Sequence, residues 1–225
     1  MDLSSSSVNW ETDIYAKGQQ LNLWPYTTVV SAFYRERAHW SADRAPKVLE
    51  VGCGAGNNLW ALAEMGFDVY GVEQSETAVR FATERLLSLG FSSSIEVGSM
   101  SDLPFSDESF DFVLDRGGIT QVPINQVPRV SAEVYRVLRS PGVFHSFTLF
   151  GENHPGKQLG TLLDNGSYDQ FTDGYFKVVG LTSFFSFESL RELFGQFEDL
   201  SIERTFHETE GIHDAEEYAL TAKKP

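Results

Sequence analysis

Residues 48–58 read Val-Leu-Glu-Val-Gly-Cys-Gly-Ala-Gly-Asn-Asn, an apolar run that passes directly into a glycine-rich turn. The run predicts a buried strand over Lys47–Val51, and the residues after the turn predict a helix over Asn58–Met65 that ends at Gly66. Glycines in such a turn let the backbone approach a ligand closely, and the helix N-terminus adds free N–H groups and partial positive charge. We therefore expect a polar or anionic ligand to lie on this turn.

A carboxylate follows at a spacing that suits a ribose. Glu73 lies twenty-one residues after Gly52, at the end of the next predicted strand, Phe67–Val72. From that strand end, its two oxygens can accept hydrogen bonds from both hydroxyls of a ribose. The spacing also fits NAD, but a dinucleotide fingerprint places its third glycine at position 57, where this chain has Asn57. The ligand is thus expected to contain a nucleoside.

The pattern of strand followed by helix repeats along the chain. Ser75 is a predicted N-cap of a helix that stops at Gly90, Pro128 suits the first turn of another helix, and Phe187–Phe194 predicts a shorter one. The predicted strands after the first two are Ser94–Val97, Phe110–Leu114, Val143–Phe150, and two near Leu200–Phe206 and Glu217–Ala222. This alternation predicts an α/β fold: a Rossmann-like, seven-stranded, mostly parallel sheet flanked by helices, with an N-terminal helical cap.

The 225 residues hold enough apolar material for one core, so a single domain over residues 1–225 is expected. Residues 151–183 are rich in Gly, Asp and aromatics without a clear period, which predicts a functional connection in contact with substrate. The acidic run from Glu208 to Glu217 predicts a solvated loop. The expected parts of the domain are a cap or lid at 1–44, a cofactor-binding half at 45–150, a substrate-side insertion at 151–185, and a C-terminal helix and strand pair at 186–225.

The charge balance excludes several classes of partner. The formal net charge is −15 and the basic residues are scattered, so nucleic acid and anionic membrane surfaces are not expected as partners. The single cysteine, Cys53, forms no internal disulfide, and the polar N-terminus has no apolar run of a signal peptide. A cytoplasmic protein that acts on a small molecule is expected, and the oligomeric state is left open.

Five short motifs occur in order through residues 47–144, namely Glu-Val-Gly-Cys-Gly-Ala-Gly-Asn at 50–57, Gly-Val-Glu-Gln-Ser at 71–75, Asp-Leu-Pro-Phe at 102–105, Ser-Phe-Asp-Phe-Val at 109–113 and Arg-Val-Leu-Arg at 136–139. The set resembles the successive signatures of class I S-adenosylmethionine-dependent methyltransferases of the small-molecule type. This resemblance implies transfer of a methyl group from S-adenosylmethionine to a small acceptor, most often at oxygen or nitrogen, with S-adenosylhomocysteine as the product.

The resemblance also assigns roles to residues around the cofactor. The glycine turn, here Gly52, Cys53 and Gly54, contacts the methionine end in that family, and Glu73 holds the ribose. The remaining residues implied by the resemblance are Gln74 beside the adenine, Ser99 and Met100 where the family usually has an adenine-reading Asp, Asp115 and Arg116 on the methyl-transfer face, and Tyr15 and Trp24 as a lid. Because Ser99 departs from the family pattern, adenine is expected to be recognised by main-chain groups together with Asp102 or Met100.

Few catalytic residues are expected, because a sulfonium methyl group is already activated and transfer needs mainly positioning and exclusion of water. His154, just after the fifth strand, is the best-placed histidine for a general base, and Asp115 is the second candidate. Asp115 is equally suited to capping the turn that follows it, and His154 to an ordinary surface loop. Met100 and Trp24 are equally suited to packing. No ligand spacing predicts a metal.

Two other functions fit part of the pattern. The glycine turn and Glu73 alone would also suit an NAD(P)-dependent oxidoreductase, although the misplaced third glycine argues against it. A non-catalytic cofactor-binding module would show the same binding residues without turnover. Nucleic-acid amino-methyltransferases resemble one another in an Asp/Asn-Pro-Pro-aromatic tetrad after the fourth strand. This chain has Asp115-Arg116-Gly117-Gly118 there, so the tetrad is missing.

Overall fold

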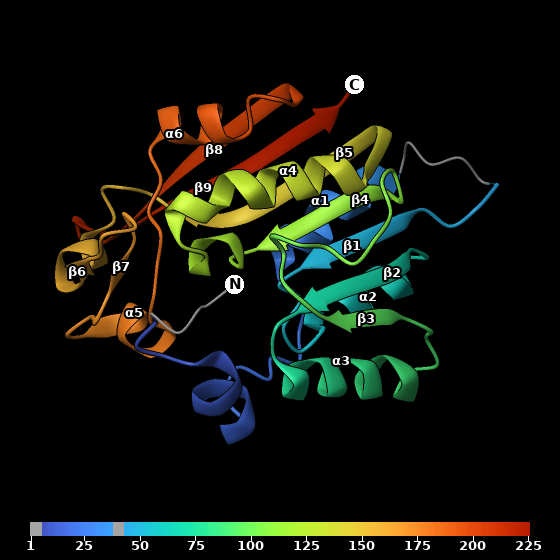
Figure 1. The fold of residues 1–225 in the computed structure, drawn as a ribbon, viewed down its shortest axis with the longest axis horizontal. Helices are drawn as coiled ribbons and strands as arrows, with labels where there is room; N and C mark the ends of the chain where they lie inside the picture. Colours follow the sequence, from blue (N-terminus) through green and yellow to red (C-terminus); the bar gives the residue numbers. More distant parts are fainter. Residues whose placement is uncertain (1–5, 38–42) are drawn as a thin grey trace.

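A twisted seven-stranded sheet forms the centre of the computed structural model, which describes residues 6–37 and 43–225 (Figure 1). The strand order is β3-β2-β1-β4-β5-β9-β8, and β9 alone runs antiparallel to its two neighbours. The strands are β1 Lys47–Val51, β2 Asp68–Glu73, β3 Ser94–Val97, β4 Phe110–Arg116, β5 Leu138–Phe150, β8 Glu198–Thr209 and β9 Ile212–Lys224. The predicted Rossmann-like, mostly parallel sheet is confirmed.

Helices cover both faces of this sheet and bury a separate apolar cluster on each. In β1, Leu49 belongs to the cluster beneath α4 and α6, whereas its neighbour Val48 belongs to the cluster beneath α1 and α2. Alternation of this kind is what the two-residue period of a strand produces when both faces are buried. The helices are α1 Thr27–Glu36, α2 Asn57–Glu64, α3 Glu76–Ser88, α4 Val127–Val137, α5 Gly174–Val179 and α6 Phe187–Leu193.

The predicted helix starts are confirmed where a cap could be read from the sequence. The Ser75 side chain accepts a hydrogen bond from the N–H of Ala78 at 3.0 Å and begins α3. Two predicted boundaries are wrong. The strand predicted at Val143–Phe150 begins earlier, at Leu138, because Leu138 already pairs with Phe110 across a register irregularity that spans Ser140–Gly142. The acidic run from Glu208 to Glu217 lies largely in the strands of the β8–β9 hairpin, which turns between Thr209 and Ile212.

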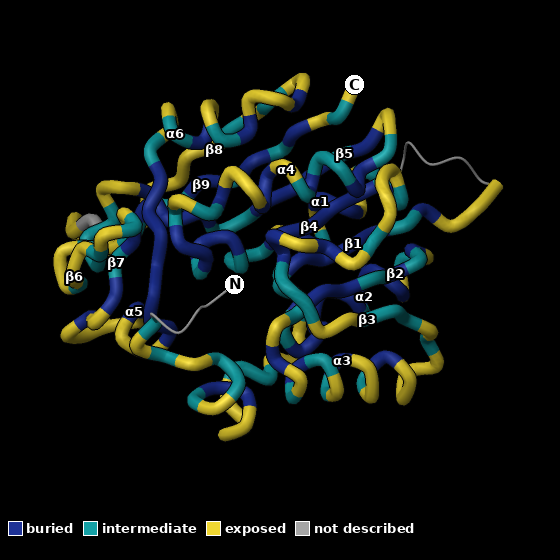
Figure 2. The backbone as a smooth tube through the Cα atoms, in the orientation of Figure 1, coloured by how far each residue is buried: buried dark blue, intermediate teal, exposed yellow. Residues whose placement is uncertain are grey.

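The segment after β5 is ordered around aromatic side chains rather than by a repeating pattern. It contains a helical turn at Pro155–Leu159, the short strands β6 Thr161–Leu162 and β7 Tyr168–Asp169, and α5. Its core is a cluster of buried Phe150, Phe171, Phe176, Val179 and Phe184. In Figure 1 this segment and the N-terminal segment lie on the side of the sheet to which the arrowheads of β1 to β4 point. Figure 2 shows that the β8–β9 hairpin and this segment expose much of their surface.

The N-terminal segment is held across that same edge. Helical turns at Trp10–Ile14 and Tyr15–Lys17 precede α1. The Ser7 N–H donates to Asp169 in β7 at 2.6 Å, and Thr77 at the start of α3 donates to Glu11 through its N–H at 3.1 Å and its hydroxyl at 2.6 Å. The segment thereby joins the two sides of the sheet edge, as a cap would. Residues 1–5 and 38–42 of the expected cap lie outside the described residues.

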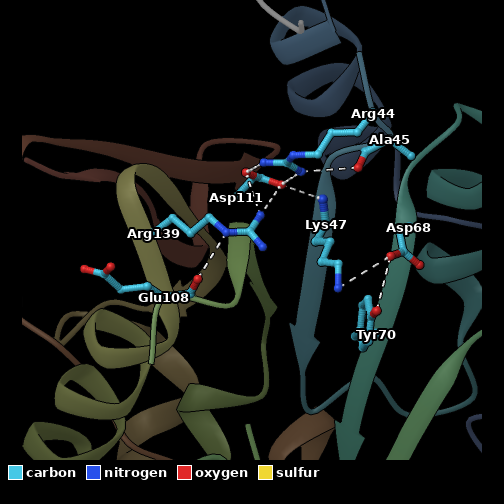
Figure 3. Close-up of polar contacts among 8 residues, drawn as sticks. All are labelled: Arg44, Ala45, Lys47, Asp68, Tyr70, Glu108, Asp111 and Arg139. Atoms are coloured by element: carbon cyan, nitrogen blue, oxygen red, sulfur yellow. Dashed lines mark hydrogen bonds and ion pairs between the residues drawn. The ribbon is translucent and has the colours of Figure 1, made fainter. Parts of the chain in front are cut away.

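At the opposite end of the strands, the carboxylate of Asp111 in β4 joins several parts of the chain (Figure 3). Arg44 donates to both of its oxygens at 2.6 Å, Arg139 donates to both at 3.0 Å, and the Lys47 N–H donates at 2.7 Å. Burial opposes ionisation of Asp111, but these donors outweigh it and lower its pKa to about 2. The contacts tie β4 to the starts of β1 and β5.

Asp111→Asn is expected to lower the free energy of unfolding by about 1–2 kcal/mol at pH 7, a range that allows for screening at the exposed Arg44. Since the pKa is lower in the folded state, this stabilisation is complete above the unfolded-state pKa of about 4 and is lost as the pH falls towards 2. Urea unfolding at pH 7 and at pH 3 measures it. Asp68→Asn, which removes a weaker contact with Lys47 at 4.0 Å, is the control and should change stability far less.

Candidate functional site

A cavity lies at the carboxyl ends of β1, β2 and β4, where parallel α/β sheets bind ligands. The glycine turn forms its floor, and the N-terminal segment contributes Trp10, Tyr15 and Tyr26 to its wall. Eight of the predicted site residues line it: Gly52, Cys53, Gly54, Glu73, Gln74, Met100, Arg116 and Tyr15. The structure therefore brings together residues that are up to a hundred positions apart in the sequence.

The glycine turn comes unusually close to the N-terminal segment. Gly54 has a φ of +51°, in the left-handed region, and a Cβ placed on it would lie 2.7 Å from the hydroxyl oxygen of Tyr15. Tyr15 itself is buried, and burial raises the pKa of its phenol, so the hydroxyl stays protonated. A glycine is required at position 54 both by the backbone conformation and by this contact.

The Glu73 carboxylate joins the turn to the loop before α3. It accepts hydrogen bonds from the N–H groups of Gly54 at 3.0 Å, Gln74 at 2.8 Å and Ser75 at 3.0 Å. Burial raises the pKa of this carboxyl, and the three N–H donors oppose that change. Oε1 accepts two of these bonds and Oε2 accepts one, so Oε2 retains a lone pair that can accept a bond from a ligand.

Glu50 is a site residue that the sequence reasoning did not assign. Its side chain is 2% exposed and lines the cavity, and it accepts a hydrogen bond from the Asn58 side chain at 2.7 Å through Oε1. Its Oε2 is buried and has no hydrogen-bond partner among the described residues. Burial raises its pKa to about 8. The available signal was a carboxylate in the middle of the apolar run of β1, since burying a carboxylate costs free energy unless a partner compensates for it.

Two residues expected near the adenine lie apart from the cavity. Ser99 bonds through its hydroxyl to that of Ser101 at 2.9 Å, and its neighbour Gly98 lines the cavity instead. Asp102 pairs through its backbone with Ser99, and its side chain is 82% exposed. Of the two alternatives for adenine recognition, the geometry favours Met100 with main-chain groups over the Asp102 carboxylate.

Asp115 caps the backbone turn that follows β4. It is fully buried, and its Oδ1 accepts from the N–H groups of Gly118 at 2.9 Å and Ile119 at 3.0 Å while Oδ2 accepts from the Ser146 hydroxyl at 2.6 Å. Burial raises its pKa to about 6. These bonds all go to the protein and Asp115 lines neither cavity, so the geometry supports the capping alternative, and a direct cofactor or base role stays an untested prediction.

A second cavity adjoins the first on the side of the 151–183 segment. His154 lines this second cavity, where its Nδ1 accepts from the Gly156 N–H at 3.0 Å and its ring packs against Phe176 at 4.8 Å between centroids. The two cavities share seven lining residues: Gln20, Asn22, Tyr26, Arg116, Thr148, Phe150 and Tyr175. We call this shared set the junction.

Trp24 lies away from both cavities. Its side chain is 76% exposed and its ring meets Trp60 edge to face at 6.3 Å between centroids, while its carbonyl accepts from the Asn57 side chain at 3.1 Å. This geometry favours the packing alternative for Trp24, whereas Tyr15 lines the first cavity and contacts the glycine turn, and a lid role for either residue stays a prediction. The neighbouring Tyr26 takes the wall position that Trp24 was expected to hold.

A family model described as a methyltransferase domain matches residues 48–142. Residues 48–142 thus hold a methyltransferase domain, and the resemblance to class I S-adenosylmethionine-dependent methyltransferases is confirmed. The matched residues run from β1 into the first part of β5, so they hold the glycine turn, Glu73 and Arg116 but not the 151–183 segment. No helix within residues 6–37 and 43–225 has the length and apolar character needed to cross a membrane.

Proteins similar to this chain include methyltransferases. An uncharacterised protein of Haemophilus influenzae is 34% identical over 124 residues, covering 53% of this chain and 47% of its own. The rice 24-methylenesterol C-methyltransferase 2 is 29% identical over 151 residues, covering 62% and 41%. The Burkholderia thailandensis 1,6-didemethyltoxoflavin-N1-methyltransferase, solved with its acceptor and S-adenosylhomocysteine, has a TM-score of 0.67 at 20% identity and covers 93% of this chain and 83% of that one. The chain thus spans less than half the length of these two sequence relatives.

Proposed function

We propose that the protein transfers a methyl group from S-adenosylmethionine to a small molecule. The observation that carries the proposal is that the glycine turn, the Glu73 carboxylate and the orphaned Oε2 of Glu50 line one cavity, which opens at the junction into a second. The first cavity offers groups for a nucleoside and for an ammonium, and the second has room for an acceptor. The alternative, an NAD(P)-dependent oxidoreductase, would place a third glycine at position 57, where this chain has Asn57.

The residues of the first cavity fit the chemical groups of this cofactor. Glu73 would accept the ribose hydroxyls, Gln74 and Met100 would flank the adenine, and Gly52 to Gly54 would bring main-chain groups to the methionine end. Glu50 would accept the positively charged amino group, which resolves its unpaired oxygen. When bound, S-adenosylmethionine supplies a methyl group on a positively charged sulfur, which needs no further activation.

The chain's own contribution would be to position the acceptor and exclude water. The N-terminal segment, which a hydrogen bond between Glu11 and Thr77 ties to α3, covers the first cavity with Tyr15. The aromatic cluster of residues 150–184 forms a wall of the second cavity. His154 in the second cavity is the base available to an acceptor that arrives protonated, although its Nδ1 already accepts from Gly156.

Calorimetry with S-adenosylhomocysteine and with NAD tests the proposal, using the purified chain and no acceptor. We expect S-adenosylhomocysteine to bind with a stoichiometry of one and NAD to give no heat of binding. A methyl-transfer assay that follows S-adenosylhomocysteine formation over a panel of phenols, amines and thiols then tests turnover. Binding of NAD without S-adenosylhomocysteine would reject the proposal, and cofactor binding without turnover on any acceptor would favour a non-catalytic module.

Glu50→Gln is expected to have opposite effects on stability and on binding. Because burial raises the pKa of Glu50 to about 8, ionising it costs stability of the free protein as the pH rises from about 4.5 to above 8, and a neutral amide avoids this cost. The variant should therefore melt at a higher temperature than the wild type at pH 9 and at nearly the same temperature at pH 5. Its affinity for S-adenosylhomocysteine should fall by about tenfold or more, since the partner of the amino group loses its charge.

Thermal melts at the two pH values and calorimetry at pH 8 measure both effects. Glu64→Gln, an exposed glutamate at the end of α2, is the control and should change neither. A Glu50→Gln variant that binds S-adenosylhomocysteine as tightly as the wild type would remove Glu50 from the cofactor site.

A further inference from the structure

The junction between the two cavities contains one charged residue, Arg116. The other six residues that line both cavities are amides, a threonine, two tyrosines and a phenylalanine. Three carboxylates, Asp173, Asp214 and Glu217, line the second cavity but not the first. The one charged side chain at the junction is therefore positive, even though the chain as a whole carries −15.

Among residues 6–37 and 43–225, no carboxylate neutralises the Arg116 guanidinium by direct contact. Its Cζ lies 3.3 Å from the centroid of the Tyr26 ring, so the group is stacked flat on an aromatic face. Its Nε is buried without a hydrogen-bond partner, and the guanidinium forms no ion pair with any described carboxylate. Glu50 and Asp115 interact with the guanidinium by electrostatic attraction without a hydrogen bond or ion pair. Buried donors of an arginine are normally satisfied, so a ligand acceptor is missing here.

The surroundings of Arg116 are aromatic. Phe150 and Phe176 are buried and meet edge to face at 4.9 Å between centroids, and Tyr175 stands beside Phe150 at 6.1 Å. Burial raises the pKa of Tyr175 while Arg116 opposes the change, so the phenol stays protonated and can donate a hydrogen bond. Flat apolar walls with two donors at one end select a planar ring that bears an acceptor group.

The geometry points to a planar aromatic acceptor with an acidic hydroxyl or thiol, which binds as the anion with its negative oxygen or sulfur against Arg116. This inference rests on the proposed function and names its acceptor class. The guanidinium favours the ionised acceptor, so the proton is left in the solvent on binding and no base is needed at the junction. An electron pair of the anion forms the new bond to the methyl carbon, and the pair of the broken carbon–sulfur bond stays on sulfur, so both opposite charges are cancelled.

The same charges disfavour an amine acceptor. Methylation of an amine produces a cationic centre beside the Arg116 guanidinium, where like charges repel. The carboxylates Asp173, Asp214 and Glu217, which line only the second cavity, disfavour a second negative charge on the part of the acceptor that they face. The acceptor is therefore expected to carry one anionic group, and that group is the one methylated.

Binding of 4-nitrophenol to the protein saturated with S-adenosylhomocysteine tests this inference, because the absorbance of the probe distinguishes its phenol from its phenolate. We expect the apparent pKa of the bound probe to fall by about one to two pH units below that of the free probe. Arg116→Met should abolish this change and weaken phenolate binding about tenfold to a hundredfold, while Arg116→Lys should retain part of it. Arg191→Met, which removes another arginine near a ring but lies in α6 outside both cavities, is the matched control and should behave as the wild type.

Benzylamine serves as the cationic probe of similar size. Three results would each overturn the inference: no binding of 4-nitrophenolate to the saturated protein, equal binding by Arg116→Met, or tighter binding of benzylammonium than of the phenolate. Calorimetry with S-adenosylhomocysteine is run first on each variant. Failure of the wild type to bind it would refute the proposed function, whereas its loss only in Arg116→Met would assign Arg116 to the cofactor and overturn the acceptor role.

Discussion

Glu73→Ala is expected to weaken binding of S-adenosylhomocysteine by about a hundredfold or more. The Glu73 carboxylate would accept both ribose hydroxyls, and hydrogen bonds to a charged group each contribute about 1.5–3 kcal/mol. The same carboxylate already accepts three N–H groups from the turn and the loop before α3. The substitution therefore removes the ribose acceptor and also frees the loops that shape the cavity. Calorimetry gives the affinity, and a thermal melt without ligand gives the structural part of the loss.

Two variants separate these contributions. Glu73→Asp keeps the charge on a shorter side chain, so we expect part of the affinity to remain. Glu76→Ala removes an exposed carboxylate three positions further on, in the first turn of α3, and should leave affinity unchanged. Wild-type affinity in Glu73→Ala, together with a normal melt, would show that the ribose is not held by this residue.

Gly54→Ala is expected to lower S-adenosylhomocysteine affinity at least about tenfold and to destabilise the free protein by about 1–2 kcal/mol. The new Cβ would lie 2.7 Å from the Tyr15 hydroxyl, so either the turn or the N-terminal segment must move. The backbone at position 54 is left-handed, with a φ of +51°, and any residue with a Cβ is strained in that conformation. Calorimetry and urea unfolding measure the two losses.

The matched controls distinguish backbone strain from the contact. Gly66 also has a left-handed φ, of +92°, but a Cβ there would meet nothing within 4 Å, so Gly66→Ala should cost stability without lowering affinity. Adding Tyr15→Phe to Gly54→Ala removes the clashing oxygen and should recover part of both losses. A double variant no better than Gly54→Ala would mean that Tyr15 does not set the shape of the turn.

The fold was predictable because its signals are local. The apolar run, the turn glycines and the Ser75 cap each specify their own element, and the alternation of strands with helices then fixes a parallel sheet. The start of β5 and the length of the β8–β9 hairpin were mispredicted, since pairing across the sheet overrides the local turn signal of Ser140–Gly142 and the high charge of residues 208–217. The 151–183 segment follows no period because an aromatic cluster, rather than a regular face, organises it.

The residues expected to bind the cofactor could be predicted where they belong to a sequence motif. Gly54 and Glu73 meet because both lie at strand ends of one sheet, and the sequence contains that information. Asp115 and Trp24 were expected at the cavity but line neither one, because sequence position does not reveal which way a side chain points: Asp115 caps a backbone turn, and Trp24 packs on Trp60. Glu50 and the stacking of Arg116 on Tyr26 depend on contacts between distant residues that periodicity does not encode.

A crystal structure of the protein with S-adenosylhomocysteine tests the central claim most directly. We predict the ribose hydroxyls within hydrogen-bond distance of the Glu73 carboxylate and the amino group on Oε2 of Glu50, with the sulfur facing Arg116 and the second cavity. A ligand found elsewhere, or one seated on the glycine turn with its ribose away from Glu73, would contradict the account.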